Sequence, residues 1–387
     1  MRYHRRELTV HQSVYSRRGL GLERTLVAIF ISFLMLTMAL NPSIIKASPT
    51  KQYFDGPEAY TYLQSQMAFG NRIPNTTAHQ NCVNYIFATL TGYGLNMSQQ
   101  SFKGSSGEGA GLPFTNIVGV LKANYSASKR IILAAHYDTR PFSDHDLDKR
   151  TIVPDYAHPV PGANDGASGV AVLIELAKVM QNYNRTRDIY FLFLDGEDYG
   201  TSEGSMLYGS RYYAAQMTQA EVDSTDYFIL LDMVGDKELT IHREGNSDSG
   251  LQDKIFTKAK ALNITQFINT TLYGMIDDHV PFKDRGIKVV DLIDFDYPNT
   301  TANYWHTPSD TLDKVSSASL GAVGKVMEGF LYDDIVSHPG TGGDNNTTKP
   351  PPVIPPEKPK PFIPGFEMLA LVPAIIILLV IRYRRTR

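Results

Sequence analysis

Apolar positions along the middle of the chain form two kinds of run, and the two kinds alternate. Short, continuous apolar runs are typical of buried strands, and they span residues 115–121, 130–135, 188–194, 227–233 and 287–293. Segments with apolar residues at helical spacing span residues 57–67, 78–93, 168–180, 205–217, 252–262 and 311–336. This alternation predicts an α/β fold of three layers, in which a mostly parallel mixed central sheet has helices on both faces. The first two helices are expected to pack across an edge of the sheet.

The N-terminal segment, residues 1–50, does not follow this pattern. Several arginines precede an apolar run over residues 26–40, and a small residue follows at Ala47. This arrangement is typical of a secretory signal peptide. An uncleaved anchor helix is the alternative, although the run is short for a full membrane span. In both cases the basic flank predicts that the following domain, residues 51–338, lies outside the cytoplasm.

The C-terminal segments also differ from the central domain. Residues 339–364 are rich in proline and glycine, which predicts an extended spacer. Residues 365–387 contain an apolar run, 368–381, that is followed by a basic end; such a pattern is typical of a membrane anchor with its tail inside. The Pro-Gly-Phe motif at 364–366 also resembles the sorting tail of archaeal surface proteins, which is cut and replaced by lipid. Both interpretations tether the domain to the outer face of the cell membrane.

Composition narrows the range of partners. The formal net charge of −3 is close to neutral, so there is no electrostatic reason to expect nucleic-acid binding. The single cysteine, Cys82, excludes an intrachain disulfide and a cysteine-based zinc cluster. Asn-x-Ser/Thr sequons suggest a glycosylated surface protein, and they begin at Asn75, Asn96, Asn124, Asn184, Asn263, Asn269, Asn299, Asn345 and Asn346.

Carboxylates and histidines stand where several predicted strands end. Glu197 and Asp198 follow the strand 188–194. Neighbouring residues on an extended backbone point to opposite sides, so one of the two can hold a metal while the other moves a proton. Further candidates at strand ends or in adjacent loops are His136, Asp165, Asp232 and His306. Singly, each could be an ordinary buried or capping residue. Together, nitrogen and oxygen ligands without sulfur suit a catalytic zinc ion.

In order and context these residues resemble the zinc aminopeptidase and glutaminyl cyclase superfamily, over most of residues 130–312. The resemblance implies a fold of the zinc exopeptidase, phosphorylase/hydrolase-like, kind. In the aminopeptidases the matching positions hold two zinc ions, with Asp165 bridging, through His136, Asp165, Asp198, Asp232 and His306. In the cyclases one zinc ion is held through Asp165, Asp198 and His306. The resemblance makes Glu197 the residue that moves a proton in both reactions.

Other residues favour the cyclase branch. Trp305, the single tryptophan, precedes His306, and the cyclases place a tryptophan there to pack on the substrate glutamine. An ordinary core aromatic is the alternative interpretation of Trp305. The segment 276–282 resembles the cyclase segment whose second aspartate, here Asp278, binds the reacting amide. Three more segments resemble those of cyclases, namely 139–142, 207–211 and 231–235.

The sequence thus predicts an extracytoplasmic zinc enzyme that acts on free N termini of peptides or proteins and is attached to the membrane by its C-terminal tail. The favoured activity is cyclisation of N-terminal glutamine to pyroglutamate, with release of ammonia. The first alternative is a zinc aminopeptidase, in which Glu197 activates water to hydrolyse the first peptide bond. The second alternative is a surface binding module that kept the fold and lost the chemistry, and the complete set of ligands argues against it.

Overall fold

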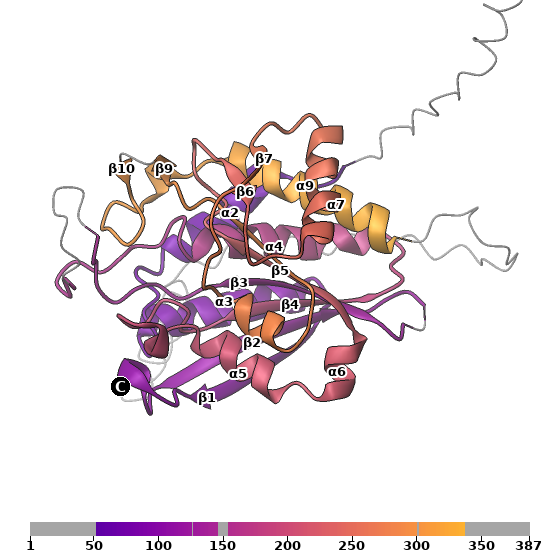
Figure 1. The fold of residues 1–387 in the computed structure, drawn as a ribbon. Coiled ribbons are helices and arrows are strands. Elements are labelled where there is room, and N and C mark those ends of the chain that lie inside the picture. Colours follow the sequence, from indigo (N-terminus) through magenta and orange to yellow (C-terminus); the bar gives the residue numbers. More distant parts are fainter. Residues whose placement is uncertain (1–51, 126, 146–153, 300–301, 337–387) are drawn as a thin grey trace, which may run out of the picture. The chain divides into compact units, whose positions relative to one another are not determined.

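A six-stranded mixed sheet forms the centre of the computed structural model, which describes residues 52–336 except 126, 146–153 and 300–301 (Figure 1). Strands β4, β3, β5 and β8 run parallel to one another, whereas β2 pairs antiparallel with β4 and with the edge strand β1. In the order in which they lie across the sheet, the strands are β1 (Asn96–Lys103), β2 (Pro113–Leu121), β4 (Asp188–Leu194), β3 (Arg130–His136), β5 (Thr225–Asp232) and β8 (Val289–Ile293).

Helices cover both faces of the sheet (Figure 1). One face carries α2 (Gly56–Met67), α3 (Thr77–Gly92), α4 (Ala167–Val179), α7 (Ser249–Ala261) and α9 (Ser317–Ile335). The other carries α5 (Tyr208–Gln216), α6 (Gln219–Ser224) and α8 (Val280–Asp284). Strand β3 shows why both faces need cover. Its buried residues Ile131, Leu133 and Ala135 pack in the first core, and Ile132 and Ala134 pack in the second. Burial of both sets favours the three-layer arrangement.

The predicted three-layer mixed α/β fold is confirmed, but several details differ. Helix α2 does not lie across a sheet edge, because it packs on α4 and α9. Helix α3 packs on the sheet face against β2 and the edge strand β1, so it lies near the edge as expected. Helix α5 begins at Tyr208 rather than at Ser205, because Leu207 takes a left-handed φ of 57° at the N-cap. Helix α9 begins at Ser317 rather than at residue 311, because a 3-10 turn at Leu312–Lys314 precedes it.

Some short or exposed elements have no counterpart in the prediction. Strand β1 was missed because most of its residues are exposed, which leaves no apolar run to recognise. Helices α6 and α8 are too short to show a helical period. Two small pairs of strands lie outside the main sheet; they are β6 (Ile241–Arg243) with β7 (Phe267–Thr271), and β9 (Pro298–Asn299) with β10 (Ala302–Asn303).

The carboxyl ends of the parallel strands meet at one edge of the sheet, where the candidate residues lie. His136 is the last residue of β3 and pairs with Leu194, the last residue of β4. Ala134 of β3 pairs with Leu230 of β5, so Asp232, two residues further on, lies level with His136. Ligands of open α/β sheets bind at this edge.

The predicted terminal segments lie outside the described residues. Within the described part of the chain, no helix is long and apolar enough to cross a membrane. The first described residues are attached to α9, because the carboxylate of Glu328 accepts hydrogen bonds from the backbone N–H groups of Tyr53, at 2.7 Å, and Phe54, at 3.0 Å. The domain limits of 51 and 338 stay predictions.

Candidate metal and catalytic site

His136, at the end of β3, lies between two carboxylates. Its Nε2 atom is 3.1 Å from Asp165 Oδ1 and 3.3 Å from Asp232 Oδ1. Asp165 comes from the loop before α4, where Gly166 takes a φ of +101° and a Cβ would lie 2.4 Å from the carbonyl oxygen of Asp138. Only glycine fits such a turn. Two strand ends and one glycine-containing loop thus bring these three side chains together.

A second histidine faces the other oxygen of Asp165. The Nε2 atom of His306 is 3.1 Å from Asp198 Oδ1 and 3.8 Å from Asp165 Oδ2. His306 has a left-handed φ of 57°, a conformation that non-glycine residues adopt rarely. Because the two oxygens of Asp165 face different histidines, this carboxylate stands where a bridge between two metal ions would stand.

The donor atoms of these residues suit a divalent metal ion. Among the described residues, buried polar atoms without a hydrogen-bond partner include both ring nitrogens of His136 and one oxygen each of Asp165, Asp198 and Asp232. Burying such atoms unpaired is costly, and a cation would satisfy them. Ligand atoms of Asp165, Asp198 and His306 lie within 4.8 Å of one another. Nitrogen and oxygen donors without sulfur match zinc sites of the catalytic kind.

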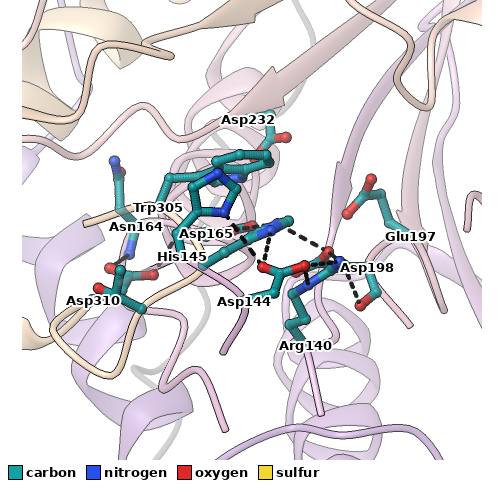
Figure 2. Close-up of polar contacts among 12 residues, drawn as sticks. Arg140, Asp144, His145, Asn164, Asp165, Glu197, Asp198, Asp232, Trp305 and Asp310 are labelled. Carbon is teal, nitrogen blue, oxygen red and sulfur yellow. Dashed lines mark hydrogen bonds and ion pairs between the residues drawn. The ribbon is translucent and has the colours of Figure 1, made fainter. Parts of the chain in front are cut away.

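Glu197 and Asp198 directly follow β4 and contact different histidines. Glu197 Oε2 is 3.8 Å from His136 Nδ1, whereas Asp198 contacts His306, and Figure 2 shows their carboxylates apart. Burial, together with the charge of Asp198, raises the pKa of Glu197 well above its ordinary value. A carboxyl group with a raised pKa can accept and donate a proton near neutral pH.

A buried network that contacts His306 was not predicted from the sequence, and Figure 2 labels its members Arg140, Asp144 and Asp198. Asp144 Oδ1 is 3.0 Å from His306 Nδ1. Arg140 donates through Nη2 to Asp144 Oδ2 at 2.6 Å and through Nη1 to Asp198 Oδ1 at 2.5 Å. Burial opposes ionisation of Asp198, but His306 and Arg140 outweigh it, and the pKa of Asp198 lies below its usual value. The sequence placed Arg140 in a cyclase-like segment without giving it a role, and no pattern pointed to Asp144.

Asp310 holds the loop that carries Asp165. Its carboxylate accepts hydrogen bonds from the backbone N–H groups of Asn164, at 2.8 Å, and Asp165, at 3.1 Å, and from the hydroxyl of Tyr297, at 2.8 Å. Asn164 Oδ1 in turn accepts from the N–H of Gly235 at 2.7 Å. Asp310 and Asn164 are 146 residues apart, so no local sequence pattern predicts their contact.

Two further carboxyl groups, Asp277 and Asp278, lie close to Glu197. Asp278 is fully buried, and the hydroxyl of Ser210 donates to its Oδ1 at 2.5 Å. Asp277 is 5% exposed, and its charge raises the pKa of Glu197 more than the charge of Asp278 does. Burial, followed by the charge of Asp232, raises the pKa of Asp277 itself well above its ordinary value. The charges of both residues act on Glu197, and the role predicted for Asp278 stays a prediction.

Trp305 lies beside the candidate metal site and outside the main core. Its half-buried ring stacks on His306 with the ring centroids 3.7 Å apart. It also packs against His145, at 4.4 Å, and Phe295, at 4.8 Å. Because the ring is partly open to solvent and touches a candidate ligand, its position suits the wall of a substrate pocket better than an ordinary core role.

Residues 116–331 match the model of peptidase family M28, and this range includes every candidate residue described above. The chain belongs to this family. The resemblance to the aminopeptidase and glutaminyl cyclase superfamily, stated from the sequence, is thereby confirmed. The expectation of an enzyme from one of these two branches is also confirmed, because proteins similar to this chain belong to both branches.

Curated relatives carry both activities. The chain is 27% identical over 227 residues to aminopeptidase YwaD of Bacillus subtilis, covering 57% of this chain and 44% of that protein. It is also 27% identical over 254 residues to glutaminyl-peptide cyclotransferase of Bos taurus, covering 57% of this chain and 66% of that protein. The chain thus spans less than half of the aminopeptidase and about two thirds of the cyclotransferase.

Solved structures show the same division. The glutaminyl cyclase of Bacteroides thetaiotaomicron superposes with a TM-score of 0.67 and 32% identity, covering 74% of this chain and 100% of that one. A leucine aminopeptidase precursor from the same organism gives a TM-score of 0.66 and 32% identity, covering 74% and 99%. A zinc-dependent exopeptidase of Parabacteroides distasonis gives 0.66 and 31%, covering 73% and 100%. Overall similarity therefore does not separate the two activities.

Proposed function

We propose that this protein is a zinc-dependent glutaminyl cyclase, which closes the N-terminal glutamine of a peptide into pyroglutamate and releases ammonia. The observation that carries the proposal is the position of Trp305. Its half-buried ring stacks on the candidate ligand His306 at 3.7 Å, where it can pack on the side chain of a bound glutamine. Similarity to the cyclases of Bacteroides thetaiotaomicron and Bos taurus supports the same activity.

The reaction needs one residue that carries a proton and a site that activates an amide. Asp165, Asp198 and His306 would hold zinc, and a bound zinc ion supplies Lewis acidity toward the γ-amide carbonyl oxygen. Glu197 accepts a proton from the substrate α-amine and returns it to the departing amide nitrogen. The α-nitrogen forms a bond to the amide carbon, the bond from that carbon to the amide nitrogen breaks, and ammonia leaves. Because water is not the nucleophile, a wall such as Trp305 that excludes water limits hydrolysis.

Asp278 is assigned the contact with the reacting amide nitrogen, and its neighbour Asp277 is the alternative. Both residues are buried, and each has one carboxyl oxygen without a hydrogen-bond partner; the other oxygen accepts from the Ser210 hydroxyl in Asp278 and from the N–H of Asp278 in Asp277. Both Asp277→Asn and Asp278→Asn keep the side-chain shape. We expect Asp278→Asn to lower kcat more than Asp277→Asn does, as measured by ammonia release. A larger loss in Asp277→Asn would move the role to that residue.

The second candidate function is hydrolysis of the first peptide bond by an aminopeptidase with two zinc ions. The observation that favours it is the placement of Asp165 between His136 and His306, with Asp232 next to His136. In this reaction Glu197 would take a proton from the attacking water and deliver it to the departing amine. Similarity to the Bacillus subtilis aminopeptidase agrees with this alternative.

Mass spectrometry of the reaction products separates the two functions. The zinc-loaded protein is incubated with peptides that begin with glutamine and, separately, with leucine. A cyclase removes the mass of ammonia from the glutamine peptides and leaves the leucine peptides intact. Release of free leucine, faster than any loss of ammonia, would favour the aminopeptidase. Absence of both products, in a protein that also takes up no zinc at neutral pH, would favour a binding module.

We also propose that the domain works outside the cytoplasm, attached to the outer face of the membrane by its C-terminal tail. The support is the basic and apolar pattern of residues 1–50 and 365–387. The sequon residues Asn75, Asn96 and Asn263 are exposed in the described domain, as glycan attachment requires. Mass spectrometry of the protein isolated from its own cells, with attention to both termini and to glycans, tests this. Recovery in the cytosol with unmodified termini would contradict it.

A further inference from the structure

A hollow lies beside the candidate site, between the end of β8 and the loop that precedes Asp277. Its lining includes the apolar residues Tyr273, Met275 and Phe295 and the acidic residues Asp294 and Asp296. Tyr273 is 48% exposed and Phe295 is half-buried. Apolar rings that stay this open are available to pack on a ligand.

Aromatic rings connect this hollow to the candidate metal site. Trp305 stacks on His306, Phe295 lies 4.8 Å from Trp305, and Tyr273 lies 6.2 Å from Phe295, measured between ring centroids. An extended peptide advances about 3.3–3.6 Å per residue. A peptide whose N-terminal residue packs on Trp305 can therefore place its second, third or fourth residue over the hollow.

The charged residues of the hollow differ in how many hydrogen bonds they already make within the protein. Arg243 donates to Asn269 and to Asp253, each at 2.5 Å. The carboxylate of Glu244 accepts from the N–H groups of Asn246 and Met275 and from the Ser247 hydroxyl. The charged groups of Arg243 and Glu244 are therefore already engaged in contacts within the protein.

Of the two aspartates, only Asp296 has capacity left for a ligand. Asp294 is buried, and its two oxygens accept from the N–H of Thr240 at 2.8 Å and from the Thr240 hydroxyl at 3.3 Å. Asp296 is half-buried and receives a long hydrogen bond, 3.4 Å, from the Tyr273 hydroxyl. Asp296 is thus the carboxylate of the hollow best able to accept a cationic group.

We propose that this hollow is a subsite for a lysine or arginine side chain near the N terminus of the substrate peptide. The apolar stem of such a side chain packs on Tyr273 and Phe295, and its cationic end meets Asp296. This inference rests on the proposed action on peptide N termini, and it adds a preference for basic residues shortly after the first. The cyclisation of glutamine and the release of ammonia do not themselves require that preference.

Peptides that begin with glutamine and differ at one position test the subsite. Lysine, its neutral analogue norleucine, or glutamate is placed in turn at the second, third and fourth positions of an otherwise alanine peptide, and kcat/KM is measured by ammonia release. At one position we expect lysine to exceed norleucine by about two- to fivefold, the range of a partly exposed ion pair. The preference should weaken at high salt. Equal rates at all three positions would overturn the proposal.

Variants locate the preference. Asp296→Asn should bring the ratio of lysine to norleucine close to one, whereas Asp223→Asn, an exposed aspartate on α6, should leave it unchanged. A preference that survives in Asp296→Asn would also overturn the proposal. If no peptide releases ammonia, the cyclase assignment fails instead. The same ratios are then measured for release of N-terminal leucine, so that the subsite is judged separately.

Discussion

The two histidines of the candidate site have different support, although each faces one oxygen of Asp165. His306 is held by Asp144 at 3.0 Å, and Arg140 connects Asp144 to the candidate ligand Asp198 through hydrogen bonds of 2.6 and 2.5 Å. The guanidinium group of Arg140 thus links Asp144, which orients His306, to Asp198. Such outer contacts fix the ring orientation and raise metal affinity.

On the other side, His136 has weaker support and more acidic surroundings. The nearest carboxylate behind its Nδ1 atom, that of Asp138, is 3.5 Å away. Three more carboxyl groups gather beyond Asp232, namely those of Asp277, Asp278 and Asp291. Burial raises the pKa of Asp277 and Asp291 well above the ordinary value, because the charged form of a carboxyl group is unfavourable in a buried position.

This difference suggests that the two sides of the site have different roles at the same edge of the sheet. The proposed zinc cluster of Asp165, Asp198 and His306 is partly organised in advance, because hydrogen bonds already fix the side chains of Asp198 and His306. The ring of His136 is fixed less closely, because the nearest carboxylate behind its Nδ1 atom is 3.5 Å away. A cyclase needs one firm zinc site and a proton carrier, and the difference between the two sides agrees with the proposed function.

The largest effect is expected on the proton-transfer side, from Glu197→Gln. This change keeps the shape of the side chain and the proposed zinc ligands but removes the proton carrier. General acid–base catalysis contributes roughly 10²–10⁴-fold, so kcat should fall by about that factor while zinc stays bound. Steady-state kinetics and metal analysis of the same sample check both parts. A variant that loses zinc, or that keeps most of its kcat, would contradict the assigned role.

Removal of each histidine in turn tests the comparison directly. His306→Ala removes a ligand of the well-supported cluster, and we expect it to lose zinc and activity together. His136→Ala should keep most of its zinc if the protein binds one ion. A protein with two ions should lose about half of its zinc in His136→Ala. Equal zinc content in both variants and the wild type would refute the ligand assignment.

A smaller effect is expected from Asp144→Asn, which acts on zinc only through His306. Loss of an outer carboxylate typically costs about 10–100-fold in metal affinity. Zinc affinity is measured by competition with a chelator, and Asp223→Asn serves as an exposed control. Melting of the zinc-free protein distinguishes positioning from general damage, because a positioning role leaves that temperature close to wild type. Unchanged affinity in Asp144→Asn would show that the network does not support the metal site.

Sequence reasoning found the strand ends and missed the contacts behind them. The positions of four residues were predictable, because each lies at or just after the end of a continuous apolar run that indicates a buried strand. These residues are His136, Asp232, Glu197 and Asp198. In a parallel sheet such ends meet at one edge, so closeness in space follows from the pattern alone.

The supporting residues have no comparable pattern. Asp144 lies in an irregular loop, and its contact with His306 spans 162 residues. Asp310 reaches Asn164 over 146 residues. Contacts of this kind depend on how loops pack, which periodicity does not describe. The contact between Ser210 and Asp278, which spans 68 residues, was likewise not predictable from a local pattern.

The smallest effect is expected from Trp305→Ala, which touches neither the proton carrier nor an oxygen ligand. The ring stacks on His306 but is half-buried, so its loss should cost about 1 kcal/mol of transition-state binding, the low end of the range for apolar pocket contacts. That is roughly a fivefold fall in kcat/KM for glutamine peptides, since 1.4 kcal/mol corresponds to about tenfold. Kinetics on glutamine peptides, with zinc content and melting temperature, measure it.

The conservative variant Trp305→Phe decides whether the ring acts on substrate or on stability. It keeps an aromatic face beside His306, so it should recover most of the lost kcat/KM if the ring packs on the bound glutamine. If Trp305 were an ordinary structural residue, Trp305→Ala would instead melt at a clearly lower temperature while the relative rates of glutamine and leucine peptides stayed the same. That outcome would remove the observation that favours the cyclase, and the placement of Asp165 between two histidines would then make the aminopeptidase the better assignment.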